Sequence, residues 1–243
     1  MPLNQNEGAA LRDGDAAQRN APCPICGGGV FVAGPKGRLS PGGIEPRCTE
    51  CQSLERHRGF RLVFNALRPV FAGRAALQFS EDRSVPRDAF GSFEVSHYGG
   101  PNHLDLAAIE KASGSCGVVI ANHVLEHVEN DLAALRELDR ISAPLGIVIL
   151  SVPDLLRCEA TVEYGFARED KHGHYRLYGP DIVDRLRRAV PQWNGLGVIA
   201  KDPVTGEPDR LTVLSRDSGA LACCESALRS AGFAPFDAFS EPG

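Results

Sequence analysis

The feature that most constrains the fold is a strand–helix–strand pattern in the middle of the chain. "CGVVIAN" (116–122) and "GIVILSVP" (146–153) are short apolar runs rich in β-branched residues, which predicts two buried strands. Between them, leucines recur at helical spacing from 131 to 141, and Asn130 precedes them as the predicted N-cap. Strands of this kind joined by an amphipathic helix are typical of a parallel sheet.

The same alternation continues on both sides of this unit. A helix is predicted from Ser53, as N-cap, to the break at Pro69. Further strands are predicted at 74–80, 93–98, twice within 196–215 around a Pro/Gly turn, and at the edge in 234–239, and further helices at 179–190 and 220–233. The pattern predicts an α/β fold with a mostly parallel sheet. Ligands of such sheets bind at the carboxyl ends of the strands, where the strand order reverses.

The N-terminal part carries a different signal. Of the eight cysteines, four form two C-x-x-C pairs separated by 21 residues. Four thiolates suit tetrahedral zinc with no open ligand position, so we expect a structural zinc site. Its predicted ligands are Cys23, Cys26, Cys48 and Cys51. The alternatives are reduced, unliganded cysteines or, less favoured, a redox pair. The predicted domains are a polar tail (1–20), a zinc ribbon (21–53) and the α/β domain (54–243).

Composition excludes some function classes. The net charge is −5 and the pI about 5.8, which disfavours broad nucleic-acid binding. No apolar run approaches the roughly 20 residues that span a bilayer, and the N-terminus lacks a signal-peptide pattern. We therefore expect a cytoplasmic protein without a membrane partner. The basic stretch from Arg56 to Arg61 is interpreted as a solvated helix face, with a phosphate-binding patch as the alternative.

Four quoted motifs together resemble a known family. "CPICG…CTECQSLERHR", "ALQFSED", "VVIANHVLEHVENDLAALRELDRISAPLGIVILSVP" and "HGHYRLYG" are similar to class I S-adenosylmethionine (SAM)-dependent methyltransferases, and more narrowly to the type 11-like group with an N-terminal zinc ribbon. The resemblance covers about residues 22–190. It implies a seven-stranded, doubly wound, Rossmann-like methyltransferase fold with SAM bound across the strand ends.

The resemblance also implies which residues contact the cofactor. They are Phe79, Ser80 and Glu81 after the first strand, His97 and Tyr98 after the second, Asp105, and Asn122, His123 and Val124 after the fourth. Two departures from the family pattern stand out. The loop after the first strand has no glycine, and no acid stands at the second strand end to bind the ribose hydroxyls. Glu81 as a solvated turn residue and Asp105 as an N-cap remain alternatives.

Two histidines are candidates for the general base, His123 and His174, because an imidazole titrates near neutral pH. His127 is expected to be structural, bonded with Glu126 across the turn. The order H-V-L-E-H lacks the H-E-x-x-H pattern of metallopeptidases, so this stretch alone does not predict a metal. His174 and Arg176 lie in a long loop and are candidates for substrate contact, with an ordinary surface loop as the alternative.

The sequence thus predicts methyl transfer to an oxygen or nitrogen of a small metabolite or glycan, with SAM as cofactor and structural zinc. Two alternatives remain. One is a catalytically degenerate relative that serves as a binding or scaffold protein. The other is a zinc-ribbon methyltransferase directed to RNA. The sequence predicts neither the acceptor nor the oligomeric state.

Overall fold

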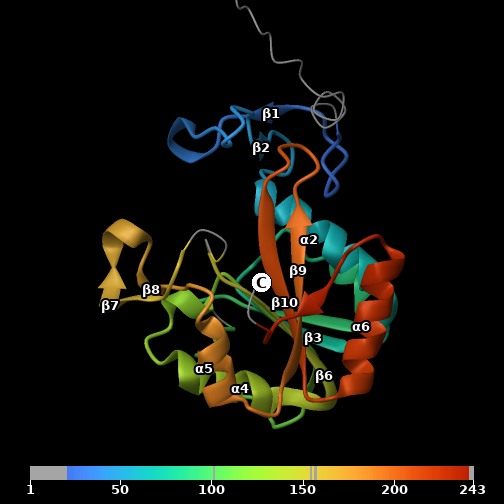
Figure 1. Cartoon of the computed structure of the whole chain (residues 1–243), viewed down its shortest axis with the longest axis vertical. Coiled ribbons are helices and arrows are strands. Elements are labelled where there is room, and N and C mark those ends of the chain that lie inside the picture. The colour runs from blue at the N-terminus through green and yellow to red at the C-terminus, as the bar shows by residue number, and fades with distance from the viewer. Residues whose placement is uncertain (1–20, 101, 154, 156–157, 241–243) are drawn as a thin grey trace, which may run out of the picture.

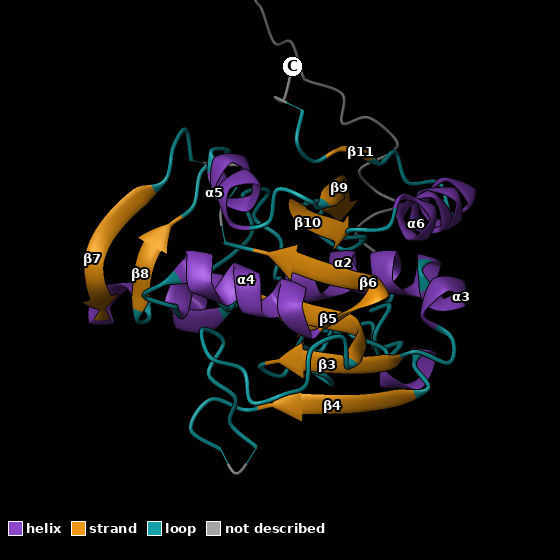
Figure 2. Ribbon diagram, turned by 90° about the horizontal axis from the view of Figure 1, so that it is seen from below, coloured by secondary structure: helices purple, strands orange, loops and turns teal. Residues whose placement is uncertain are grey.

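Seven strands form one mixed sheet in the computed structural model, which describes residues 21–100, 102–153, 155 and 158–240. The strand order is β11-β9-β10-β6-β5-β3-β4 (Figure 2). In chain order the strands are β3 (Ala75–Phe79), β4 (Ser92–Ser96), β5 (Cys116–Asn122), β6 (Ser142–Ser151), β9 (Asn194–Lys201), β10 (Pro208–Ser215) and β11 (Phe236–Asp237).

The sheet is mixed, with five of its seven strands running in one direction. The pairs β3–β4, β3–β5 and β5–β6 are parallel, whereas β10 is antiparallel to both β6 and β9, and β11 is antiparallel to β9. The hairpin of β9 and β10 is the pair of strands predicted around the Pro/Gly turn.

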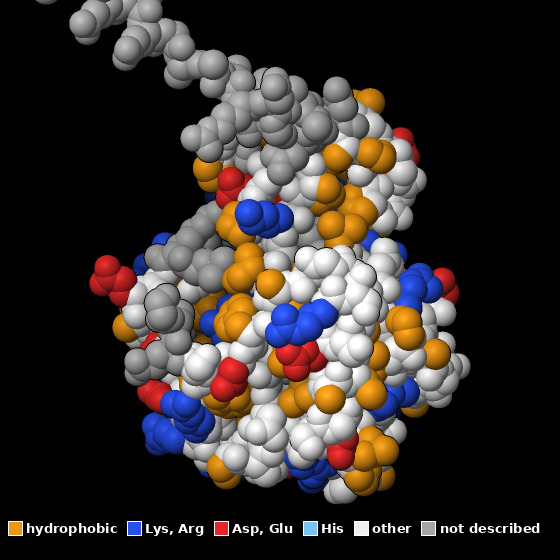
Figure 3. Space-filling view, turned by 45° about the vertical axis from the view of Figure 1, so that its right-hand side comes forward, with side chains coloured by type: hydrophobic (Ala, Val, Ile, Leu, Met, Phe, Trp, Pro, Cys, Tyr) orange, Lys and Arg blue, Asp and Glu red, His pale blue; other side chains and the backbone are white. Residues whose placement is uncertain are grey.

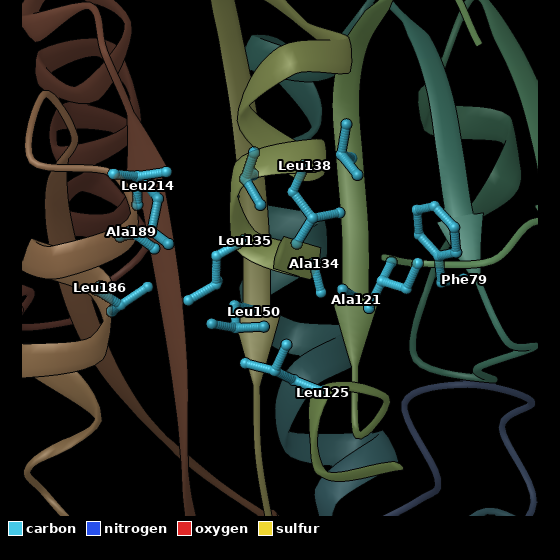
Figure 4. Close-up of a cluster of buried hydrophobic side chains, with 14 of the residues drawn as sticks. Phe79, Ala121, Leu125, Ala134, Leu135, Leu138, Leu150, Leu186, Ala189 and Leu214 are labelled. Carbon is cyan, nitrogen blue, oxygen red and sulfur yellow. The ribbon is translucent and has the colours of Figure 1, made fainter. Parts of the chain in front are cut away.

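Helices cover both faces of the sheet, as the doubly wound prediction requires. They are α2 (Glu55–Ala66), α3 (Arg68–Phe71), α4 (Asp131–Ile141), α5 (Ile182–Ala189) and α6 (Ser218–Ser230). α4 and α5 pack on one face in a core cluster that includes Leu135 and Leu138 of α4 and Leu150 of β6 (Figure 4). α2, α3 and α6 pack on the other face. The predicted α/β fold, with helices on both sides, is confirmed.

The helix ends show where local rules hold. Asn130 caps α4 as predicted, since its side chain accepts a hydrogen bond from the Ala133 N–H at 3.1 Å. Ser53 does not cap α2, which was a wrong prediction. The backbone N–H of Leu54 instead donates to Nδ1 of His57 at 3.0 Å, while the Ser53 hydroxyl lies 3.1 Å from the Cys51 sulfur.

A second hairpin lies in the segment predicted as a long loop. β7 (Val162–Arg168) and β8 (His174–Leu177) pair in antiparallel fashion beside the main sheet (Figure 1). β7 is exposed or half-buried along its whole length. It therefore lacks the apolar run that reveals a buried strand.

The cysteine-rich segment forms a small unit above the sheet (Figure 1). Its strands β1 (Phe31–Val32) and β2 (Arg47–Cys48) pair in antiparallel fashion. Fully buried Arg58 of α2 joins this unit to the tip of the β9–β10 hairpin, by two hydrogen bonds of 2.8 and 2.6 Å to Asp202 and others to the carbonyls of Pro46 and Ser53. The predicted tail at 1–20 lies outside the described residues.

On the face in Figure 3, Lys and Arg side chains alternate with acidic ones rather than forming a patch of one sign. None of the helices in the described part of the chain is long and apolar enough to cross a membrane.

The Arg58–Asp202 pair should contribute strongly to the stability of the folded chain, because it links the ribbon to the sheet. Both side chains have 0% exposure, so Asp202→Asn leaves a buried guanidinium without its counter-charge. We expect the free energy of unfolding in urea to fall by about 3–5 kcal/mol. Asp88→Asn, which breaks the exposed Arg68–Asp88 pair, is the matched control and should change little. Equal, small effects of the two variants would contradict the structural role of Arg58.

Candidate functional site

The strand order reverses between β3 and β5. From β3 the chain goes to edge strand β4 and then returns to the other side of β3 as β5. The first residue after each of these strands has a left-handed backbone, with φ 61° at Ser80 and 52° at His123. Such a conformation costs a non-glycine residue roughly 1–2 kcal/mol and is common at functional sites. Ser80 thus adopts the backbone for which glycine is usual.

Polar side chains join the strand ends at this reversal. The Asn122 amide donates to Asp82 at 3.1 Å, and its oxygen accepts from the Ser151 hydroxyl at 3.2 Å. Asn122 is buried, so it is fixed between the loop after β3 and the end of β6. Asp82 was not among the predicted site residues, although a carboxylate just beyond a strand end was a signal that could have identified it.

A cavity of about 800 Å³ lies beside this reversal, at the carboxyl ends of β5 and β6. The ribbon, the start of α2, the β7–β8 hairpin and the β9–β10 turn form its other walls. Its lining includes a set of basic and acid–base side chains: Arg56, His123, Glu126, His127, His172 and His174. Of the predicted site residues, His123 and His174 are brought together here.

His123 is held as a neutral ring. Its Nδ1 lies 2.9 Å from the Arg56 guanidinium, which can only donate, so the ring proton is on Nε2. Burial, followed by the positive charge of Arg56, lowers the pKa of His123 to about 2. A ring with this pKa is a poor base at neutral pH. The geometry therefore favours His123 as a hydrogen-bond donor through Nε2, which has no partner among the described residues.

Glu126 is the most buried carboxylate of the cavity wall. Its side chain is 1% exposed, and its Oε1 lies 3.8 Å from Nδ1 of His123. Burial raises the pKa of Glu126 to about 8, although its backbone hydrogen bond and the charge of Arg56 oppose this shift. Its Oε2 has no hydrogen-bond partner among the described residues. Glu126 was expected to bond to His127 across the turn.

His127 and His174 meet from two different elements. His127 ends the short 3₁₀ helix η3 (Leu125–His127), and His174 begins β8. Their ring centroids are 4.7 Å apart at an interplanar angle of 88°. Ligand atoms of Glu126, His127 and His174 all lie within 4.8 Å of one another. Burial lowers the pKa of His127, and a hydrogen bond with the Gly173 backbone partly opposes that shift.

Arg176 positions β8. It is buried, and it donates to the carbonyls of Val128 and Glu129 at 2.5 and 2.6 Å. These bonds hold β8 against the segment after η3 and favour a positioning role for Arg176, whose substrate contact stays a prediction. This contact is what brings His174 to the cavity.

The other predicted cofactor residues do not line the cavity. Phe79 belongs to the core, Glu81 pairs with Arg87 at 2.5 Å, and the Asp105 carboxylate accepts from the Ala107 N–H at 2.9 Å. The Asp105 contact is of the kind that a capping residue makes, which was the alternative to a cofactor contact for Asp105. At the end of β4, His97 is exposed and Tyr98 is 94% exposed. Val124 packs against the core.

The four predicted zinc ligands are gathered in the ribbon. The sulfurs of Cys23 and Cys51 are 3.6 Å apart and those of Cys26 and Cys48 are 3.5 Å apart, and all four lie within 4.8 Å of one another. Sulfurs bound to one tetrahedral zinc at about 2.3 Å would have similar separations. The residues therefore fit a four-cysteine zinc site.

A family model described as "Methyltransferase domain" matches residues 49–190. No curated protein matches the chain.

Solved structures of low identity also match. A SAM-dependent methyltransferase from Mesorhizobium loti is 13% identical, with 63% of this chain and 96% of that chain covered and a TM-score of 0.42. A putative methyltransferase from Bacillus halodurans is 11% identical, with 63% of this chain and 95% of that chain covered and a TM-score of 0.41. 1,6-Didemethyltoxoflavin-N1-methyltransferase from Burkholderia thailandensis, solved with bound 1,6-didemethyltoxoflavin and S-adenosylhomocysteine, is 11% identical, with 64% of this chain and 77% of that chain covered and a TM-score of 0.40.

The buried ring of His57, next to Arg56, should make the folded chain less stable in acid. Its pKa is lowered to about 4, first by burial and also by nearby arginines, whereas an unfolded histidine titrates near 6.5. Below pH 6.5 the unfolded chain therefore binds a proton that the folded chain refuses, and stability falls until about pH 4. This contribution totals on the order of 3 kcal/mol. His57→Gln, which can still accept the Leu54 N–H, should flatten the decline in urea midpoint between pH 6.5 and 4.5. An unchanged slope would show that His57 is not the cause.

Proposed function

Since this chain belongs to the class I SAM-dependent methyltransferase family, we propose that it transfers a methyl group to an oxygen or nitrogen of a small metabolite or glycan. The observation that carries the proposal is the cavity beside the β3–β5 reversal. Its wall holds Glu126, His127 and His174, side chains of the types that assist deprotonation of such an acceptor.

SAM would supply an activated methyl group on its sulfonium. Ser80, Asp82 and Asn122 stand at the reversal, and their hydroxyl, carboxylate and amide suit the charged groups of its methionine part. The exposed ring of Tyr98 at the end of β4 suits stacking on adenine. Phe79 would support this surface from the core.

The cavity divides the acid–base roles between its residues. His123 has a positioning role in this proposal: Arg56 holds one ring nitrogen, and the Nε2–H, which is buried in the free protein, would turn toward the bound acceptor. The cluster of Glu126, His127 and His174 is the part of the cavity that promotes loss of the acceptor's proton. In the ribbon, zinc would be structural, because four cysteines leave no ligand position for a substrate.

One observation favours a catalytically degenerate binding protein. The end of β4 carries His97 and Tyr98 rather than an acid, so the ribose hydroxyls lack their usual carboxylate acceptor. An RNA-directed role has less support. Arg58 is buried against Asp202, and Arg61 donates to the Arg83 carbonyl, so much of the basic stretch is used within the protein.

Cofactor binding separates the enzyme from a relative that has lost it. We expect S-adenosylhomocysteine to bind the full chain with micromolar affinity in a calorimetric titration. Asn122→Ala should weaken it about tenfold or more, because the strand ends lose the amide that fixes Asp82. Asn65→Ala, at an exposed position of α2, is the control. No binding at millimolar ligand would overturn the enzyme proposal.

Metal analysis tests the ribbon independently. We expect one equivalent of tightly held zinc per chain and its loss in Cys26→Ser, with a lower melting temperature because the ribbon has little core of its own. Cys223→Ser, at an exposed cysteine on α6, should keep both properties. Full zinc content in Cys26→Ser would refute a four-cysteine site.

A further inference from the structure

We propose that Glu126, His127 and His174 form a second metal site, which takes a divalent first-row transition ion. This site lies in the cavity wall and is separate from the ribbon. The metal site itself does not depend on the proposed function. Only its consequence for the methyl acceptor rests on that function and deepens it.

The donor set fits such an ion. Two imidazoles and a carboxylate are a recurrent ligand set for Zn²⁺ and, as a facial triad, for Fe²⁺. The ligand atoms lie within 4.8 Å of one another. Rotations of the three side chains would bring them to the roughly 2.0–2.2 Å bonds that these metals make with nitrogen and oxygen.

A second observation points to a cation at this place. The Glu126 side chain is 1% exposed, yet its Oε2 has no hydrogen-bond partner among the described residues. Buried polar atoms are rarely left without a hydrogen-bond partner, and a bound cation would give Oε2 one. Arg56 does not donate to Oε2. Its Nη1 lies 2.9 Å from Nδ1 of His123, and its Nε has no hydrogen-bond partner among the described residues.

The surroundings hold the ligands as a metal site requires. One ring nitrogen of His127 is hydrogen-bonded to the Gly173 backbone, which leaves the other nitrogen for a metal and fixes the ring. Arg176 clamps β8 to the carbonyls of Val128 and Glu129, and so keeps His174 beside η3.

Three protein ligands leave coordination positions that face the cavity. A hydroxyl oxygen of the acceptor could occupy one of them, and the metal would lower the pKa of that hydroxyl. The proton passes to solvent, the oxygen forms its bond to the methyl carbon, and the electron pair of the breaking S–C bond stays on sulfur. The site therefore favours an acceptor that carries a hydroxyl group.

The test uses the full chain with zinc kept in the ribbon. Mn²⁺ is the probe, because it prefers oxygen and nitrogen donors to thiolates, and its free ion is counted by electron paramagnetic resonance. We expect one Mn²⁺ to bind per chain. Glu126→Gln and His174→Gln should each weaken binding tenfold or more, with unchanged zinc content. His103→Gln, at an exposed histidine in another loop, should bind as the wild type does.

Two results would overturn the proposal. One is wild-type protein that binds neither Mn²⁺ nor Co²⁺ at millimolar concentration, which does not depend on whether a variant folds. The other is Glu126→Gln and His174→Gln variants that bind as tightly as the wild type. The metal is titrated without any methyl donor. Failure here with intact S-adenosylhomocysteine binding therefore sinks the metal site alone, whereas the reverse result sinks only the cofactor assignment.

Discussion

The reversal of strand order between β3 and β5 is the constraint on which the rest of the site depends. Because the chain leaves β3 for one side and β5 lies on the other, the loops that follow these two strands diverge and leave polar strand ends accessible. Ser80 and His123 are both bent into left-handed backbone there. The directions that these two loops take place Asp82 beside Asn122 and Glu126 in the cavity wall.

Much of the fold was predictable because its signals are local. The buried elements β5, β6 and α4 carry apolar runs or a leucine stripe in their sequences. Asn130 marks the start of α4, because it is a favoured N-cap residue. β7 gave no such signal because neither of its faces is buried. Ser53 failed as a cap because its hydroxyl lies against the sulfurs of Cys23 and Cys51, a contact that only the folded ribbon creates. The contacts of Arg176 with the carbonyls of Val128 and Glu129 had no signal in the sequence, because backbone acceptors leave no side-chain pattern.

The candidate site was predictable in part for the same reason. The stretch from Asn122 to His127 attracted notice because its residues are contiguous, and its order lacks the spacing of a metallopeptidase. Metal ligation by Glu126 and His127 needs a third residue, and His174 reaches them only through the unpredicted β7–β8 hairpin. Sequence spacing describes one element at a time, whereas this cluster is made by two. The role of His123 depended likewise on Arg56, which α2 delivers from far along the chain.

The clamp around Arg58 has a consequence for the order of folding. Its partner Asp202 is 144 residues further along the chain, so the ribbon leaves the ribosome long before the residue that secures it. During synthesis the ribbon therefore stays undocked, and Arg58 stays in water, until the β9–β10 hairpin has been made. A truncated chain that ends before this hairpin would lack both the partner of Arg58 and the cavity wall that the β9–β10 turn supplies.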